Sequence, residues 1–315
     1  MTSFLGRRLL TLGLTLWLAS LVVFVVLEVL PGDPALLMLG VDARPDTLAA
    51  LRAQMGLDQP APVRYLAWTV GLLTGDLGTS HTYGVPVADL IRDRLAVTAP
   101  LAGLAMLVST AAALPLGLLA ASKRGRAADY GVMVFSQLGV AVPNFWFGIL
   151  LVLWLSIGLG WFEAGGFPGW SAGIGPALKS LTLPALTLGL TEAAILARVT
   201  RSAVLDTLGE DYVRTARAKG LSRGAVMRRH VLRNALIPIT TIVGLQFAFL
   251  LGGAIVVENV FFLPGLGRLL FQAISQRDLI VVKDAVMVLA AMVVAINLIV
   301  DILYAVIDPR PKAAS

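Results

Sequence analysis

Long apolar runs separated by shorter polar segments dominate this chain of 315 residues. A helix that crosses the apolar core of a membrane needs about 20 consecutive, mostly apolar residues. Six runs reach or approach that length, at residues 9–30, 98–121, 130–158, 181–200, 236–257 and 285–307. The pattern therefore predicts an all-α integral membrane protein with six transmembrane helices.

Two of these runs depart from a simple span. The run 130–158 is long enough to tilt or to contain a kink, and Pro143 lies near its middle. The run 181–200 is the weakest of the six, because polar residues such as Thr187 and Glu192 interrupt it. A tilted helix and a kinked helix both stay open for the third run, and the fourth has internal polar positions.

The first apolar run follows Arg7 and Arg8 and covers 22 residues. A cleaved signal peptide typically has an apolar region of about 7–15 residues that ends in small residues. This run is longer, and it ends in the sequence EVLPGDP at 28–34. We interpret it as a retained transmembrane helix.

The positions of the positive charges predict the orientation of the chain. Six spans place both termini on one side, and short cytoplasmic segments carry an excess of Lys and Arg. With the termini inside, 16 of the 25 basic residues lie in inner segments, nine of them between Arg198 and Arg233. Five of the other nine lie in the long segment 31–97, which this rule largely exempts. We predict cytoplasmic termini, so the net charge of +6 mainly reflects topology and not binding to nucleic acid.

The residues outside the spans suggest a division of the chain into three parts. Residues 1–30 form the N-terminal segment and first helix, and residues 31–97 form a periplasmic lid. Residues 98–315 form a five-helix core with a cytoplasmic loop at 201–235 and a periplasmic loop at 258–284.

Two short helices are predicted inside the lid. The first lies within residues 42–60, where Leu48, Leu51 and Met55 share one face. The second begins near residue 62 and runs into a glycine-rich turn that ends near residue 80. The lid is too small and too rich in loops to form a separate enzyme domain.

Several kinds of chemistry have no candidate residues here. The absence of cysteine excludes disulfides, thiolate metal sites and cysteine nucleophiles. The two histidines, His81 and His230, lie far apart in sequence, so we predict no metal site. The sequence G-x-x-x-x-G-K-[ST] does not occur, so no P-loop for ATP is present. We therefore predict that the chain is not an enzyme.

A few polar residues lie in or near the predicted spans. We expect Glu28, Glu258 and Asp301 to be solvated, because each lies close to the end of a span. Glu192 lies deepest, which keeps proton coupling open as an alternative. Four uncharged polar residues are expected to form hydrogen bonds between helices: Gln137, Asn144, Gln246 and Asn297.

A short charged helix is predicted near residue 210, and it begins with strong local signals. Thr207 and Glu210 have the spacing of a capping box. Asp211 adds a second negative charge to the first turn, where it suits the helix dipole. Glu210 and Arg214 are four residues apart and are expected to form an ion pair.

The same helix has equally clear signals for its end. Arg217 and Lys219 lie in the last turn, and Gly220 follows where a left-handed residue commonly ends a helix. Its apolar content is too low to span lipid, and Ala216 and Ala218 allow a close approach to another protein's groove. The alternative is a solvated connector whose arginines only enforce topology.

The sequence LARVTRSAVLDTLGEDYVRTARAKGLS, followed by HVLRNALIP, closely resembles the cytoplasmic loop of bacterial ABC-transporter permeases. The nearest branch is the dipeptide, oligopeptide and nickel importer family, in particular the B-type subunit of peptide permeases. Other stretches that match this family are LEVLPGDPA (27–35), GLLTGDLGTS (71–80), LLAASKRGRAADY (118–130) and VENVFFLPGLGRLLFQAISQRDL (257–279). The resemblance covers nearly the whole chain in the expected order, and it implies the type I ABC-importer permease fold.

The resemblance implies that the charged helix is a coupling helix that docks on an ATPase subunit. The residues implied in coupling are Glu210, Asp211, Tyr212, Arg214, Thr215, Ala216, Ala218, Lys219 and Gly220. Permeases of this kind carry Glu-Ala-Ala followed four positions later by Gly. Aligned on Gly220, the first three positions are Arg214, Thr215 and Ala216, so the usual glutamate is replaced.

The resemblance also implies a role for the outer turn after residue 258. That turn and its following amphipathic helix would lie near a periplasmic gate or a docking site for a binding protein, and the alternative is an ordinary loop helix. The residues implied are Pro264, Gly265, Gly267, Arg268, Arg277 and Asp278.

The implied function is import of di- or oligopeptides across the inner membrane by alternating access. The implied partners are a second homologous permease in a heterodimer, two ABC ATPases, and a periplasmic or lipid-anchored substrate-binding protein. ATP and Mg²⁺ would be bound by the partner ATPases, and this chain would hold no cofactor. Three alternatives stay open: import of nickel chelates or another small solute by the same family, a proton-driven secondary transporter, and a non-transporting membrane scaffold.

Overall fold

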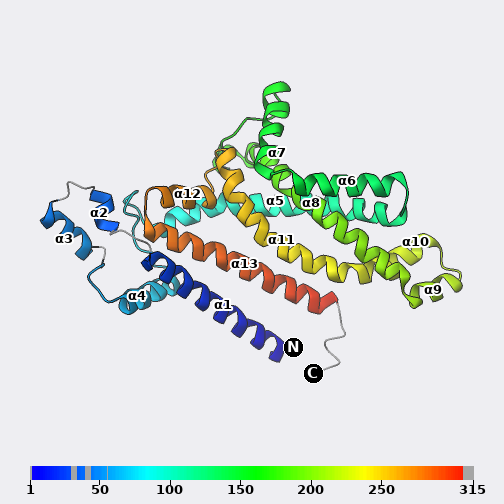
Figure 1. The fold of residues 1–315 in the computed structure, drawn as a ribbon, viewed down its shortest axis with the longest axis horizontal. Helices are drawn as coiled ribbons and strands as arrows, with labels where there is room; N and C mark the ends of the chain where they lie inside the picture. Colours follow the sequence, from blue (N-terminus) through cyan, green and yellow to red (C-terminus); the bar gives the residue numbers. More distant parts are fainter. Residues whose placement is uncertain (1, 30–33, 40–43, 55, 308–315) are drawn as a thin grey trace. The chain divides into compact units, whose positions relative to one another are not determined.

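The computed structural model describes residues 2–29, 34–39, 44–54 and 56–307, and these residues are helical with no β-strand (Figure 1). The chain divides into two compact units. Unit 1 comprises Met1–Val97 and Gly265–Ala295, and unit 2 comprises Thr98–Pro264 and Ile296–Ser315. The prediction of an all-α fold is confirmed for the described residues.

Five helices are long and apolar enough to cross a membrane, and a bent pair gives a sixth span if it is counted as one. The six match the six predicted runs. Their bounds are Gly6–Glu28, Val87–Ser122, the pair Ala127–Ala141 and Asn144–Gly158, Ile174–Gly209, Arg223–Val260 and Leu279–Ile302. Polar turns extend several helices beyond the apolar runs, because hydropathy detects only the part of a helix that suits lipid.

The third span, for which a tilt and a kink were both open, is broken at Pro143. Helix α6 (Ala127–Ala141) ends before this proline, and α7 (Asn144–Leu151) begins after it. The helical segments on the two sides, Ala127–Ala141 and Asn144–Gly158, are bent by 103°. Proline disfavours helical backbone at the residue before it, and Val142 is extended, with φ −89° and ψ 121°. A local rule of backbone geometry therefore accounts for the break.

Unit 1 contains the first helices of the chain and the segment around residue 280. Its helices are α1 (Thr2–Val29), α2 (Pro34–Leu39), α3 (Pro45–Gln54), α4 (Ala61–Thr74), the start of α5 (Val87–Ser122), α12 (Leu266–Ser275) and the first part of α13 (Leu279–Ile307). Two of these, α3 and α4, confirm the two short helices predicted for the lid. Met55 lies outside the described residues, so the shared face with Leu48 is not described.

The aromatic side chains of α4 pack against α1. Tyr65 and Trp68 lie within 5.3 and 6.2 Å of the Phe24 ring, measured between centroids, and the hydroxyls of Tyr65 and Ser20 are 2.9 Å apart. The indole of Trp68 also donates a hydrogen bond of 2.6 Å to the buried carboxylate of Asp284 in α13. These contacts hold α1, α4 and α13 together at one end.

Unit 2 is built around a single long helix. Its elements are the rest of α5, α6, α7, η1 (Val152–Gly158), η2 (Trp170–Ala172), α8 (Ile174–Gly209), α9 (Asp211–Ala218), α10 (Arg223–Val226), η3 (Met227–Leu232), α11 (Arg233–Val260) and the end of α13. Helix α8 packs against α6, α7 and α11, and most of its residues between Leu181 and Val204 are buried.

Glycine permits the closest of these helix contacts. Gly139 of α6 lies so near Ala194 of α8 that a Cβ on residue 139 would overlap the Cβ of Ala194. Small residues at helix interfaces let backbones approach and gain dispersion energy, which is a main source of helix association in lipid. The polar residues in the run 181–200 are therefore compatible with a buried, central helix.

Candidate functional site

Helix α9 is the predicted charged helix, and it begins one residue after Glu210. The capping box is wrong in detail: Thr207 belongs to α8 and donates its hydroxyl to the carbonyl of Ala203, 2.8 Å away. Glu210 occupies the N-cap position with extended backbone, and its side chain makes no capping hydrogen bond. The sequence signal fails because α8 continues through the residues that resemble a cap.

The ion pair in α9 also differs from the prediction. Arg214 pairs with Asp211 at 3.3 Å, three residues earlier, and not with Glu210. Both side chains are largely exposed, so the pair adds little to stability. Both charges therefore remain accessible on the exposed side of α9.

The end of α9 is confirmed and is well defined. Gly220 has φ +84°, and its N–H donates to the carbonyl of Arg217 over 3.0 Å. The N–H of Leu221 donates to the carbonyl of Ala216 over 3.4 Å. This pair of bonds is the Schellman motif, in which a left-handed residue reverses the chain and satisfies the last carbonyls of a helix.

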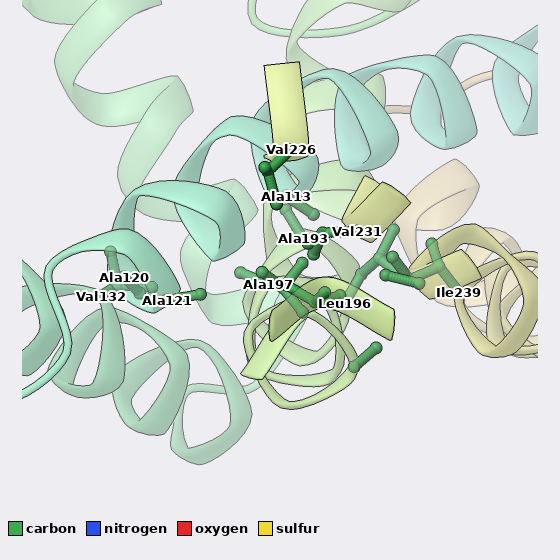
Figure 2. Close-up of a cluster of buried hydrophobic side chains, with 14 of the residues drawn as sticks. Ala113, Ala120, Ala121, Val132, Ala193, Leu196, Ala197, Val226, Val231 and Ile239 are labelled. Carbon is green, nitrogen blue, oxygen red and sulfur yellow. The ribbon is translucent and has the colours of Figure 1, made fainter. Parts of the chain in front are cut away.

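The two faces of α9 are sharply different. Val213 and Ala216 are buried and join a hydrophobic cluster with residues of α5, α6, α8, α10, η3 and α11 (Figure 2). The cluster residues labelled in Figure 2 are Ala113, Ala120, Ala121, Val132, Ala193, Leu196, Ala197, Val226, Val231 and Ile239. Helix α9 is thus anchored to its own unit, and it is not a loosely attached loop.

Most of the predicted coupling residues lie on the opposite face. The exposed ones are Glu210, Asp211, Tyr212, Arg214, Thr215, Ala218, Lys219 and Gly220. The prediction that Ala216 fits a partner's groove is wrong, because this residue is only 5% exposed and packs inside the unit. A helical period places it next to Val213, which is three residues earlier and fully buried.

A polar contact fixes α9 against the helical segment that follows it. The side-chain amide of Asn234, in α11, donates hydrogen bonds to the hydroxyl of Tyr212, 2.9 Å away, and to the carbonyl of His230, 2.8 Å away. Residues 223–260 form one continuous helical segment, so α9 contacts the beginning of a predicted span directly. Displacement of α9 would therefore act on α11 through both an apolar and a polar contact.

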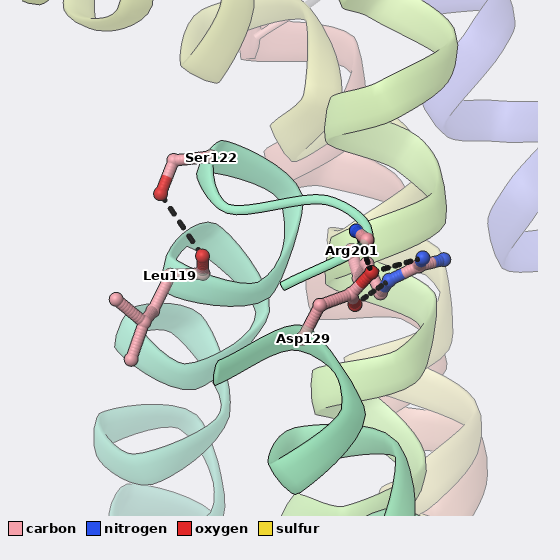
Figure 3. A network of polar contacts seen from close by, with 5 residues as sticks. Leu119, Ser122, Asp129 and Arg201 are labelled. Carbon is pink, nitrogen blue, oxygen red and sulfur yellow. Dashed lines mark hydrogen bonds and ion pairs between the residues drawn. The ribbon is translucent and has the colours of Figure 1, made fainter. Parts of the chain in front are cut away.

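An ion pair that the sequence reading missed joins α6 to α8 near the same end (Figure 3). Asp129 is 3% exposed, and both of its carboxylate oxygens accept hydrogen bonds from the guanidinium of Arg201. The bond from Nη2 of Arg201 to Oδ2 of Asp129 is 2.8 Å long. Asp129 also accepts from the N–H of Gly125 over 2.9 Å, which orders the turn after α5. The two residues are 72 positions apart, so no local pattern indicates the pair.

The outer turn contains the other predicted site residues. Gly265 is the N-cap of α12, whereas Gly267 is buried within the helix and is not part of the turn. Arg268 is half-buried in α12, Pro264 is half-buried just before it, and Arg277 is exposed with φ +56°. The predicted amphipathic helix after the turn is confirmed as α12.

Asp278 holds part of unit 1 together. It is 2% exposed, and its carboxylate accepts hydrogen bonds from the hydroxyl of Ser80, 2.6 Å away, and from the N–H of Thr82, 3.1 Å away. Its carboxylate is therefore occupied inside the fold. Among the predicted outer residues, the exposed Arg277 is better placed to meet a partner.

Two further polar predictions have different outcomes. Glu258 was expected to be solvated, and that expectation is wrong because the residue is fully buried. Its carboxylate accepts a hydrogen bond from the hydroxyl of Thr98, 2.6 Å away. Gln246 forms the expected interhelical bond, since its amide donates 2.9 Å to the carbonyl of Glu192. Gln137 and Asn297 are exposed, and the amide oxygen of Asn144 accepts from the next residue's N–H over 2.9 Å.

The described residues contain no group of three or more His, Cys, Asp or Glu side chains that could hold a metal ion. They form instead a bundle of membrane-length helices with a short charged helix outside it, anchored on one face and exposed on the other. These features are typical of a multi-pass membrane protein, with a charged helical face exposed outside its apolar helices.

The chain belongs to the family of binding-protein-dependent transport system inner membrane components. Its residues 113–313 match the model of that family, and residues 1–102 match the N-terminal model of the same transport-system membrane components. It is therefore a multi-pass inner-membrane permease subunit of an ABC transport system. The family is the membrane component of these systems and not their ATPase.

Relatives agree with this assignment over nearly the whole chain. A protein of Brucella abortus (strain 2308), named as a peptide transport system permease protein, is 43% identical over 99% of both chains. The glutathione transport system permease protein GsiC of Salmonella typhi is 42% identical over 98% of both. Among solved structures, an amino acid ABC transporter with histidines aligns with 70% of this chain and 94% of its own, at 18% identity and a TM-score of 0.46. This last similarity is too low to support a conclusion.

Proposed function

We propose that this permease imports di- or oligopeptides by alternating access between states that open to opposite sides of the membrane. The support is that relatives with more than 40% identity over nearly their full length are named for peptide and glutathione transport. Import of nickel chelates or another small solute by the same fold is the second candidate, and it rests on the family resemblance of the loop at 196–222.

We propose four kinds of partner for this chain. A second homologous permease would pair with it as a heterodimer, and two ABC ATPases would bind on the cytoplasmic side. A periplasmic or lipid-anchored binding protein would deliver the substrate from outside, and membrane lipid would surround the spans. ATP and Mg²⁺ would bind to the ATPases, so this chain performs no covalent chemistry and needs no cofactor of its own.

The topology belongs to the same proposal. Both termini and α9 lie in the cytoplasm, since 16 of the 25 basic residues then fall in inner segments. The segment 31–97 and the turn before α12 lie outside. There Arg268 and Arg277, beside Pro264 and Gly265, contribute to a gate or to docking of the binding protein.

The observation that carries the proposed mechanism is the two-faced packing of α9. Its exposed charged face is free to enter a groove of an ATPase, whereas Val213 and Ala216 fix it to the cluster that includes α8 and α11. Closure of two ATPases on ATP would move α9 as a rigid body. The clustered spans would then follow, which is how a small displacement becomes a switch between two packed states.

Reconstitution tests this function. We expect uptake of a labelled dipeptide into proteoliposomes only when the chain is combined with its permease partner, both ATPases, binding protein and MgATP. Uptake driven by a proton gradient without the ATPases would overturn the proposal in favour of a secondary transporter. Uptake of nickel chelates but not of peptides would overturn the substrate and leave the coupling scheme intact.

A further inference from the structure

Unit 1 contains a cavity of about 340 Å³ at the end of α1 and the beginning of α13. Its walls come from α1, the segment 56–59, α4, the turn 76–81 and the first residues of α13. Five lining residues are charged or titratable: Glu28, Arg64, Asp76, His81 and Lys283. Apolar residues, among them Phe24 and Ile280, form much of the remaining wall.

Lys283 is one of the charged residues that line this cavity. Its ammonium lies 5.2 Å from the ring centroid of Trp68, in a half-buried position, and it forms no ion pair with any described residue. The neighbouring carboxylate of Asp284 accepts the indole N–H of Trp68 through Oδ1, and its buried Oδ2 has no hydrogen-bond partner among the described residues. A partly desolvated ammonium needs a compensating negative charge or acceptor, so the cavity suits an anionic group beside Lys283.

Two more nitrogen atoms in the cavity lack partners. The Nε of Arg64 and the Nε2 of His81 are buried and have no hydrogen-bond partner among the described residues. Arg64 uses its Nη2 to pair with Glu28, which leaves the Nε–H available to a ligand. Arginine and lysine together are the usual donors to phosphate oxygens.

The cavity also carries negative charge. Asp76 is exposed, and its Oδ1 accepts a hydrogen bond from the N–H of Gly78 over 3.1 Å. Glu28 is already paired with Arg64, so Asp76 and Lys283 remain as a carboxylate and a cation of the lining that form no ion pair with each other. This balance favours a ligand that carries both signs over one that carries only negative charge.

The position of the cavity points to a lipid. It lies where one membrane-length helix ends and another begins, beside the aromatic cluster of Phe24, Tyr65 and Trp68. Aromatic side chains of this kind mark the headgroup level of a membrane. Next to the lining face of α1, the side chains of Leu21 and Val25 are exposed and would contact acyl chains.

We propose that this cavity binds the headgroup of a phospholipid that carries a phosphate and a primary ammonium, such as phosphatidylethanolamine. The phosphate accepts from the ammonium of Lys283 and from the Nε–H of Arg64, and the ammonium of the headgroup donates to Asp76. The acyl chains follow the exposed side of α1. The site does not depend on which solute the transporter carries.

Lipid retention measured by native mass spectrometry tests the site. The complete transporter is equilibrated with equal amounts of phosphatidylethanolamine, phosphatidylcholine and phosphatidylglycerol with identical acyl chains. We expect phosphatidylethanolamine to be retained about tenfold over each of the others, the ratio that one good charge-assisted hydrogen bond provides. Lys283→Gln should remove most of this preference.

Two variants make the test specific. Lys179→Gln is the matched control, because Lys179 also lies over an aromatic ring, 6.0 Å from the centroid of Phe162, but in unit 2. Asp76→Asn keeps the acceptor oxygen for the N–H of Gly78. This change should raise the retention of phosphatidylglycerol to that of phosphatidylethanolamine. Equal retention of all three lipids by the wild type, or displacement of lipid by an added dipeptide, would overturn the proposal.

Discussion

Arg201 of α8 donates two hydrogen bonds to the carboxylate of Asp129 in α6 (Figure 3). The same carboxylate accepts a hydrogen bond from the N–H of Gly125 in the turn before α6. Asp129 is almost fully buried, whereas the side chain of Arg201 is 22% exposed. The pair therefore joins α8 to α6, 72 positions away, and to the turn that directly precedes α6. It lies in unit 2, which also carries α9.

We predict that Arg201→Gln and Asp129→Asn each lower the melting temperature of the permease and reduce peptide uptake. Each change leaves one buried or half-buried charge without its partner, which costs more than the pair itself contributes. Arg198→Gln, an exposed position on the same helix, should change neither quantity. The double variant with both charges removed should be more stable than either single variant; additive losses would contradict the pairing.

Gly220 tests the end of α9. We predict that Gly220→Ala destabilises the loop by about 1–2 kcal/mol, the cost of a left-handed conformation for a residue with a Cβ. A clash is not the reason, since nothing lies within 4 Å of the position that a Cβ would take. Thermal unfolding and co-purification with the ATPase are the two measurements.

Gly224 provides the control for this change. It lies in α10, its φ is not left-handed, and it also has open space around it, so Gly224→Ala should be neutral or slightly stabilising. If both glycines tolerated alanine equally, the Schellman turn would not be needed for coupling.

Two alanines of α9 separate stability from docking. Ala218→Arg should weaken ATPase binding while changing the free energy of unfolding by less than about 0.5 kcal/mol, because residue 218 is exposed. Ala216→Arg should destabilise the permease by about 2 kcal/mol or more, because it forces a charge into the buried cluster. The reverse order of effects on melting temperature would show that α9 packs with its other face inward.

The contact of α6 with α8 gives a further prediction. Gly139→Ala should cost about 1–3 kcal/mol, because the new methyl group overlaps Ala194 and forces the helices apart. Gly131→Ala on the same helix is the control, since that position has open space. Thermal unfolding in a fixed detergent distinguishes the two, and an equal response of both variants would contradict the close packing.

Local signals in the sequence predicted the elements well where physics acts over a few residues. Pro143 breaks a helix because its ring excludes helical backbone at Val142, and Gly220 ends α9 because it adopts positive φ. The capping box at Thr207 failed for the opposite reason. Its spacing is a local signal, but α8 continues through it, with Leu205 and Leu208 half-buried against the cluster beneath α9.

The site was predicted less completely than the helices. The charge order of α9 indicated a helix in water, but it did not show which face the rest of the chain would cover. Ala216 was therefore assigned to a partner although it is buried, and Glu258 was assigned to solvent although it accepts from Thr98. Both errors concern burial by residues far away in sequence.

The sequence by itself determined that this is a helical membrane protein with six apolar runs, a proline near the middle of the third run, and a short charged helix that follows the fourth run and ends at Gly220. These properties follow from hydropathy and backbone geometry, which depend on neighbouring residues. Only the tertiary structure decided that Asp129 meets Arg201, that Lys283 lies over Trp68 in a cavity, and that Val213 and Ala216 face inward. Such contacts depend on which helix faces pack together, and that choice is made by the whole unit at once.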